Sequence, residues 1–99
     1  GATNKKIVLN SLIWMRTSVY DIVFTDNTTA LASTDRGIYL STDAGLSFSL
    51  ITTNYQTQIF HALAKSPSNP QVVYAGSEQG LILRSIDGGH HWSIFVSKN

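Results

Sequence analysis

Short apolar runs separated by polar turns follow one another along most of this 99-residue chain. Each run is a few residues long and mixes Val, Ile, Leu, Tyr and Phe with small or polar residues. Runs of this kind, bounded by Gly, Asp, Asn and Pro, are typical of β-strands. The pattern predicts two sets of four strands, over residues 19–24, 29–33, 37–40 and 48–51, and over residues 59–64, 72–76, 80–84 and 92–96.

A motif of eight residues occurs once in each set. Residues 41–48 and residues 85–92 both read Ser-x-Asp-x-Gly-x-x-aromatic, and Asp87 follows Asp43 by 44 positions. A recurrence at this period, in a chain rich in short strands, predicts repeated four-stranded blades. The strand at residues 59–64 is the most continuously apolar of its set, so we expect it to lie innermost in its blade. The first set repeats this order, so the strand at residues 19–24 is expected to be its innermost strand.

The expected role of the motif is to lock a tight turn. The Asp accepts hydrogen bonds from backbone N–H groups ahead of it, and the Gly supplies a positive φ. The trailing aromatic side chain covers the apolar surface of the hairpin. The residues expected to form these structural turns are Asp43, Gly45 and Phe48 in the first copy and Asp87, Gly89 and Trp92 in the second.

This motif is similar to the Asp-box, also called the bacterial neuraminidase repeat. The second copy matches it fully, whereas the first has Phe48 where Trp is usual and Ala44 where Gly is common. Asp-boxes occur in sialidases, sortilin-type receptors, xyloglucan-degrading endoglucanases and the photosystem II assembly-factor family, and residues 80–92 resemble the last of these most. The resemblance implies an all-β fold: a β-propeller segment of two four-stranded antiparallel blades with an extra N-terminal strand. In these families the box is a structural turn away from the usual ligand face.

The repeat divides the chain into three parts. Residues 1–17 hold an outer strand, expected over residues 7–13, and a loop; residues 18–53 form the first blade and residues 54–99 the second. The second copy has one more residue between Gly80 and Ser85 than the first has between the matching positions, and we expect a bulge in strand 80–84 to absorb it. Nine candidate strands exceed the eight that two blades need. The leading strand therefore pairs with another chain or an absent region, or the chain is a piece of a longer protein.

Two blades are too few to close a ring, because propellers have about four to eight. We expect the ring to be completed by other copies, as a trimer or tetramer, or by missing blades of a parent chain. An isolated copy would expose an apolar patch on its flanks. The side chains expected on these flanks are Phe24, Tyr39, Phe60, Leu63, Tyr74 and Ile82.

Composition and charge narrow the classes of partner. A net charge of +1 and scattered basic residues give no electrostatic footprint for nucleic acid, and the apolar run at residues 7–15 is too short to insert into a membrane. The chain has no cysteine, which is compatible with cytosol, periplasm or secretion. We expect an extracytoplasmic or secreted location, without a cofactor.

Catalytic and metal chemistry find little support in the sequence. Arg16, Arg36 and Arg84 occupy different kinds of position, so they do not predict the arginine cluster of a sialidase. Asp21, on an inner strand, is expected to accept backbone amides rather than to catalyse. His61 is expected to be a hydrogen-bonded structural histidine; the alternative is that symmetry-related copies line a pore as a metal or anion site. We therefore predict no catalytic residues and no metal site.

Binding agrees better with the sequence. Loops that lead into the inner strands, together with loops that join second and third strands, gather polar and aromatic side chains at one end of a propeller. The candidate binding residues in these loops are Trp14, Arg16, Asp35, Arg36, Tyr55, Gln56, Glu78 and Gln79. The sequence therefore favours a non-enzymatic binding or assembly scaffold for a protein or carbohydrate ligand. The alternatives are a fragment of a sialidase-like or glucanase-like enzyme and an oligomeric sugar-binding lectin.

Overall fold

The computed structural model of the chain describes residues 18–52 and 58–97. The expected outer strand at residues 7–13 lies outside this part. All regular elements of the described residues are strands, and none of these residues forms a helix able to cross a membrane. The strands are β1 (Val19–Phe24), β2 (Ala30–Thr34), β3 (Gly37–Ser41), β4 (Ser49–Leu50), β5 (Phe60–Lys65), β6 (Val73–Ser77), β7 (Leu81–Ser85) and β8 (Ser93–Ser97).

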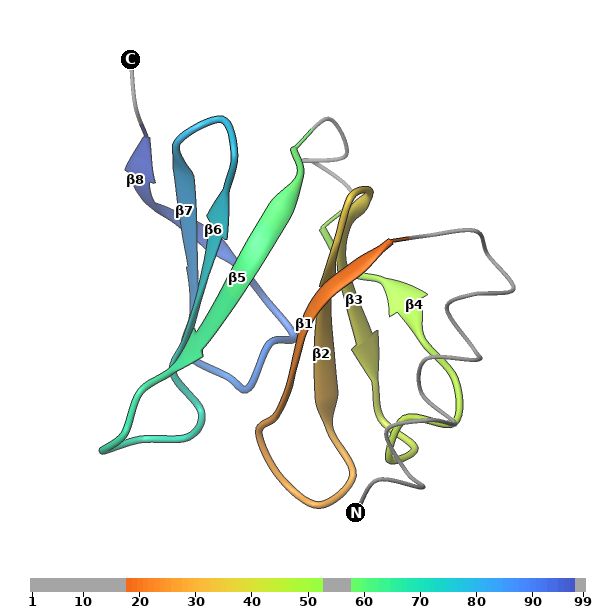
Figure 1. Cartoon of the computed structure of the whole chain (residues 1–99). Helices are drawn as coiled ribbons and strands as arrows, with labels where there is room; N and C mark the ends of the chain where they lie inside the picture. The colour runs from red at the N-terminus through yellow and green to blue at the C-terminus, as the bar shows by residue number, and fades with distance from the viewer. Residues whose placement is uncertain (1–17, 53–57, 98–99) are drawn as a thin grey trace.

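The strands form two separate antiparallel sheets (Figure 1). Their order is β1-β2-β3-β4 in the first sheet and β5-β6-β7-β8 in the second, so each strand pairs with its neighbours in the sequence. All eight strands predicted from the hydrophobic pattern are present, and each observed end lies within one residue of the predicted end. The shortest is β4, which keeps only Ser49–Leu50 of the predicted residues 48–51 because only Tyr39 and Leu40 of β3 pair with it.

The additional residue of the second sheet lies in a turn, not in a bulge of β7 as the sequence suggested. The β6–β7 ladder is regular from the Val73–Ser85 pair to the Gly76–Ile82 pair. The turn that follows is one residue longer than the β2–β3 turn, and Gly80 occupies it with a φ of 89°. A glycine at positive φ lets a hairpin loop take an additional residue without breaking the ladder.

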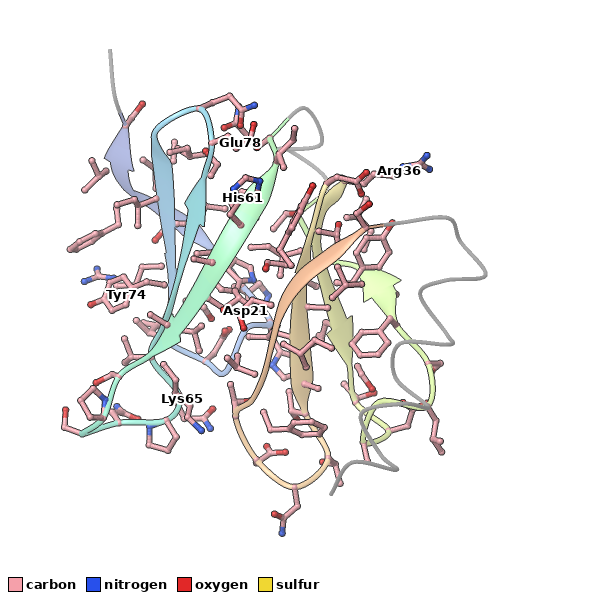
Figure 2. All side chains as sticks on the ribbon, in the orientation of Figure 1. Asp21, Arg36, His61, Lys65, Tyr74 and Glu78 are labelled. Atoms are coloured by element: carbon pink, nitrogen blue, oxygen red, sulfur yellow. The ribbon has the colours of Figure 1, made fainter. Side chains whose placement is uncertain are left out.

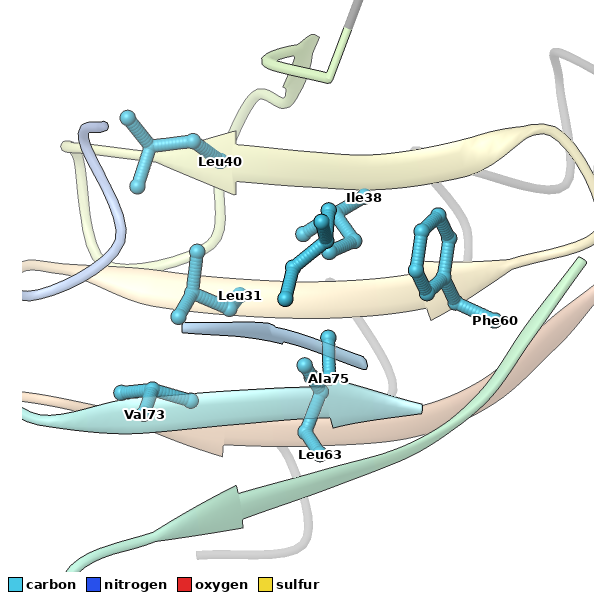
Figure 3. Close-up of a cluster of buried hydrophobic side chains, with 8 residues drawn as sticks. Leu31, Ile38, Leu40, Phe60, Leu63, Val73 and Ala75 are labelled. Carbon is cyan, nitrogen blue, oxygen red and sulfur yellow. The ribbon is translucent and has the colours of Figure 1, made fainter. Parts of the chain in front are cut away.

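The two sheets pack face to face and share one apolar core (Figure 3). Leu31, Ile38 and Leu40 come from the first sheet. The second sheet contributes Phe60, Leu63, Val73, Ala75 and Leu83. Leu31 and Phe60 are fully buried, and burial of each such side chain contributes about 1.5–3 kcal/mol. The sheets are therefore joined by the main core of the described residues.

This packing corrects the expected composition of the flanks. Phe60 and Leu63 lie between the sheets instead of on an outer face, because the face of β5 that carries them is covered by the first sheet. Tyr39 is also buried, in a second cluster with Ala32 against which Phe48 packs. The first sheet therefore uses both of its faces for burial.

Polar contacts along the inner strands reinforce the contact between the sheets. The Leu63 backbone N–H donates to Asp21 Oδ2 at 3.0 Å, and the Ile22 N–H donates to Asp21 Oδ1 at 3.0 Å. Lys65 Nζ donates to the Phe24 carbonyl oxygen at 2.8 Å. Asp21 thus accepts backbone amides, as expected for this inner-strand position, and one of these amides belongs to the other sheet.

Gly89 lies where the second motif turn meets the first sheet, and it generates a prediction about stability. Its φ is 105°, and an added Cβ would lie 2.7 Å from Leu31 Cδ1. We expect Gly89→Ala to lower the free energy of unfolding by about 1–3 kcal/mol, and Gly89→Val by more, because backbone strain and overlap with Leu31 combine. Chemical denaturation of the purified variants measures both effects.

Two controls separate this effect from a general sensitivity of the turn. Gly76→Ala adds a Cβ with no atom within 4 Å, and His90→Ala alters an exposed turn residue. Both changes should stay within about 0.5 kcal/mol of the original chain. Equal stabilities for all four variants would contradict the assigned packing of Gly89 against Leu31.

Candidate functional site

The first motif turn is closed by hydrogen bonds to a serine and an aspartate. Ser41 Oγ donates to Asp43 Oδ1 at 2.7 Å and accepts the Gly45 N–H at 2.8 Å, while the Ser47 N–H donates to Asp43 Oδ1 at 2.9 Å. Gly45 has a φ of 93°, and Ala44 before it has a φ of 62°. Ala44 is the one non-glycine residue with positive φ in the described part of the chain. The matching residue of the second turn is Gly88, which adopts a positive φ without strain, so the first turn is the more strained of the two.

The second turn repeats this network with a histidine in place of a serine. Ser85 Oγ donates to Asp87 Oδ1 at 2.8 Å and accepts the Gly89 N–H at 2.8 Å. Asp87 accepts the His91 N–H at 3.0 Å and also contacts His91 Nδ1. Trp92 Nε1 donates to the Gly89 carbonyl oxygen at 2.8 Å, so the indole closes the turn by a hydrogen bond as well as by packing.

These hydrogen bonds lower the pKa values of both carboxylates. In Asp43, bonds from the Ser47 side chain, the Ser41 side chain and the Ser47 backbone lower the pKa to about 2. In Asp87, burial acts to raise the pKa, but bonds from His91 and Ser85 and the charge of His91 outweigh it and hold the pKa well below its usual range. Both groups are therefore ionised acceptors near neutral pH and poor proton donors.

The other end of the two sheets carries the expected binding loops. Asp35 and Arg36 form the β2–β3 turn, and Glu78 and Gln79 lie in the β6–β7 turn, at the same end of the molecule and opposite the motif turns (Figure 1). The remaining candidates lie outside the described residues: Trp14, Arg16, Tyr55 and Gln56.

The side chains of Asp35 and Gln79 connect their turns to the residues just before the inner strands. Asp35 Oδ1 accepts the Ser18 N–H at 3.1 Å, and the Asp35 N–H donates to the Ser18 carbonyl oxygen at 3.2 Å. In the second sheet Gln79 Oε1 accepts the Ile59 N–H at 3.1 Å, and the Glu78 N–H donates to the Ile59 carbonyl oxygen at 2.9 Å. The side chains of Asp35 and Gln79 therefore tie these turns to the start of the inner strand, whereas the side chains of Arg36 and Glu78 are exposed.

A cluster of three side chains crosses from one sheet to the other near this end. His61 Nε2 lies 2.6 Å from Glu78 Oε2, and the His61 ring lies 4.4 Å from the Tyr20 ring, centroid to centroid. All three side chains are close to half exposed, and Figure 2 shows His61 below Glu78, near the start of β5. We call Tyr20, His61 and Glu78 the inner-strand cluster.

Bulges at matching positions orient two members of this cluster. The β1–β2 register skips Tyr20, and the β5–β6 register skips His61. A bulge of this kind turns the side chain of the additional residue and is frequent near binding sites. The sequence showed His61 on an inner strand, but it gave no signal for Tyr20, because neither the bulge nor the neighbouring sheet can be read from the alternation of apolar residues.

The inner-strand cluster offers an aromatic face, an imidazole and a carboxylate to a ligand. His61 Nε2 contacts the Glu78 carboxylate, and its ring lies against Tyr20. Across residues 18–52 and 58–97, no group of three His, Asp or Glu side chains is placed to hold a metal ion. Asp21, the residue after Tyr20 on β1, accepts a backbone N–H at each of its two carboxylate oxygens. The arrangement is suited to stacking and hydrogen bonding of a ligand.

Comparisons with known proteins point to the fold. No protein-family model matches the chain, and no curated protein matches it. Among solved structures, an ancestral GH74 enzyme is 18% identical with a TM-score of 0.68, over 77% of this chain and 12% of that one. YCF48 bound to a D1 peptide is 16% identical with a TM-score of 0.66, over 83% of this chain and 26% of that one. YCF48 from Cyanidioschyzon merolae is 22% identical with a TM-score of 0.65, over 83% of this chain and 24% of that one.

These similar structures are β-propellers, and this chain spans about a quarter of their length or less. The two described sheets are therefore four-stranded antiparallel propeller blades, which confirms the fold class expected from the sequence.

The low pKa of Asp43 predicts a specific pH dependence of stability. Its pKa is about 2 in the folded chain, and about 3.9 is expected when the chain is unfolded. The folded state therefore binds fewer protons between these values, so the stabilisation is complete above about pH 4 and is lost as the pH falls through 2. We expect the difference in urea midpoint between the original chain and Asp43→Asn to shrink from pH 6 to pH 2.

A direct titration checks the cause of this pH dependence. The carboxyl ¹³C resonance of Asp43 should titrate near pH 2, and at a higher pH in Ser47→Ala, which removes the hydroxyl donor. Two results together would contradict the assigned hydrogen bonds. The difference in urea midpoint between the original chain and Asp43→Asn would stay constant over the whole pH range, and Asp43 would titrate at the same pH in the original chain and in Ser47→Ala.

Proposed function

We propose that this chain is a non-enzymatic binding or assembly scaffold, in a propeller ring completed by further blades or by other copies. Its ligand is a protein segment, held at the end that carries the β2–β3 and β6–β7 turns. The observation that supports this proposal best is the inner-strand cluster, in which Tyr20 of one blade and the His61–Glu78 pair of the next form one half-exposed surface.

Geometry supports binding at this surface. Tyr20 and His61 belong to the innermost strands, β1 and β5, where a closed ring brings equivalent positions of all blades together. Their backbones are fixed by paired strands and by the Asp21 bond between the sheets, so little ordering is needed when a ligand binds. Aromatic side chains with a polar neighbour are the common anchors of protein interfaces.

The expected binding residues extend this surface along the same end. Arg36 is exposed on the β2–β3 turn, and Glu78 contributes its carboxylate from the β6–β7 turn. Trp14, Arg16, Tyr55 and Gln56 are proposed to belong to the same end from their places in the sequence. One of the similar propellers is YCF48 bound to a D1 peptide, which agrees with a peptide or protein ligand for this fold.

A carbohydrate-active fragment is the second candidate, because an ancestral GH74 enzyme is among the similar structures. Glycoside hydrolysis usually needs two carboxyl groups placed on either side of the scissile bond. Of the described acids, Asp21 accepts two backbone amides, and Asp43 and Asp87 close turns at the opposite end. The described blades therefore favour binding over hydrolysis.

Peptide selection followed by affinity measurement tests the proposal. Linear peptides from a displayed random library, selected on the immobilised chain, should lose about tenfold or more in affinity for Tyr20→Ala and for Glu78→Gln. Asn27→Ala, an exposed change in the loop at the opposite end, should leave the affinity unchanged.

Two results would overturn the proposal. One is a set of selected peptides that bind Tyr20→Ala and Glu78→Gln as tightly as the original chain. The other is hydrolysis of a xyloglucan or a sialoside that Asp21→Asn abolishes, which would favour the enzyme fragment. Binding of an unhydrolysed glycan that requires Tyr20 would favour the lectin instead.

A further inference from the structure

Glu78 differs from the other acidic residues of the described chain in the way its carboxylate is used. Each described aspartate accepts at least one hydrogen bond from a backbone N–H; these aspartates are Asp21, Asp26, Asp35, Asp43 and Asp87. The Glu78 carboxylate accepts no hydrogen bond from the described residues, and its polar contact among them is with His61 Nε2. Of the six acids in the chain, Glu78 is therefore the one that keeps unused acceptor positions.

The surroundings of this carboxylate are aromatic. Glu78 Oε2 lies 2.6 Å from His61 Nε2, and the His61 ring lies 4.4 Å from the Tyr20 ring with the two planes tilted by 59°. Tyr20 is 47% exposed, and the side chain of Glu78 is 44% exposed. One imidazole thus separates an exposed carboxylate from an exposed aromatic ring. Such a pair suits a guanidinium group, which can stack on a ring and hydrogen-bond to a carboxylate at the same time.

The basic side chains of the described residues are engaged or directed elsewhere. Lys65 Nζ donates to a backbone carbonyl oxygen of β1, and the Arg84 guanidinium lies over an aromatic ring of β8. Arg36 belongs to the β2–β3 turn of the first blade, and Figure 2 shows its side chain pointing away from His61 and Glu78. Charge complementarity therefore favours a cationic group that comes from outside the described residues.

We propose that the protein segment bound at the inner-strand cluster carries an arginine, whose guanidinium group pairs with Glu78 and stacks on Tyr20. This inference rests on the proposed function and adds the chemistry of the partner, which is a basic segment. Arginine suits this place better than lysine, because its planar fork can bond to a carboxylate while it lies on a ring, whereas the lysine ammonium is a compact point charge.

A pair of small probes tests this chemistry without prior selection of a peptide. N-acetyl-arginine methylamide and its citrulline twin, which has the same shape without the charge, are titrated separately into the isotope-labelled chain by nuclear magnetic resonance. We expect the arginine probe to shift the carboxyl resonance of Glu78 and the ring resonances of Tyr20 and His61. Its dissociation constant should be lower than that of the citrulline probe by about threefold or more, because only the arginine probe forms the ion pair.

Variants assign this preference to the cluster. Glu78→Gln should abolish the difference between the two probes. The double variant Glu78→Gln with Asn27→Asp restores the net charge at an exposed residue of the opposite end, and it should not restore the difference. Tyr20→Leu keeps an apolar side chain but removes the ring, so it should weaken binding of the arginine probe.

Four results would overturn the inference. They are equal affinities for the two probes, no binding of either probe, a preference that survives Glu78→Gln, and a preference that the double variant recovers. The last result would show that net charge, rather than the position of the Glu78 carboxylate, decides the preference.

The peptides selected from the random library separate this inference from the proposed function. Selected peptides that bind more weakly to Tyr20→Ala but share no basic residue would leave the proposed function standing and overturn the arginine. Selected peptides that bind Tyr20→Ala and Glu78→Gln as tightly as the original chain would overturn the proposed function itself.

Discussion

The burial of two apolar sheet faces against each other is the constraint on which the rest of the described structure depends. Leu31 and Phe60 are fully buried in the core that both sheets build together. The same contact explains why Gly89 must be glycine, since Leu31 occupies the space that a side chain there would need. The second motif turn thus contributes to the contact between blades as well as to its own hairpin.

Functional geometry follows from this contact. The packed sheets fix β1 beside β5, and this brings Tyr20 of one blade against His61 of the next. Asp21 reinforces the arrangement through the Leu63 N–H, from a position only one residue after Tyr20. The inner-strand cluster is therefore built on paired strands, and bulges at Tyr20 and His61 set the direction of two of its side chains.

Much of the fold could be predicted from the sequence, because strand alternation and turn chemistry are local properties. All eight described strands and the hydrogen bonding of Asp21 followed from such signals. The covering of Phe60 was missed, because which face of a strand meets a neighbouring sheet is decided by packing between distant segments. Tyr20 was missed for the same reason, since its partner His61 lies in the other sheet and a bulge orients its ring.

Native-state amide hydrogen exchange of the original chain and of Leu31→Ala tests the shared core most directly. If the two sheets form one cooperative unit, the central amides of β2 and of β6 exchange with the same free energy of opening, and the substitution lowers both by the same amount. An exchange pattern in which β6 keeps its protection while β2 loses it would contradict the account, because each sheet would then be stable without the other.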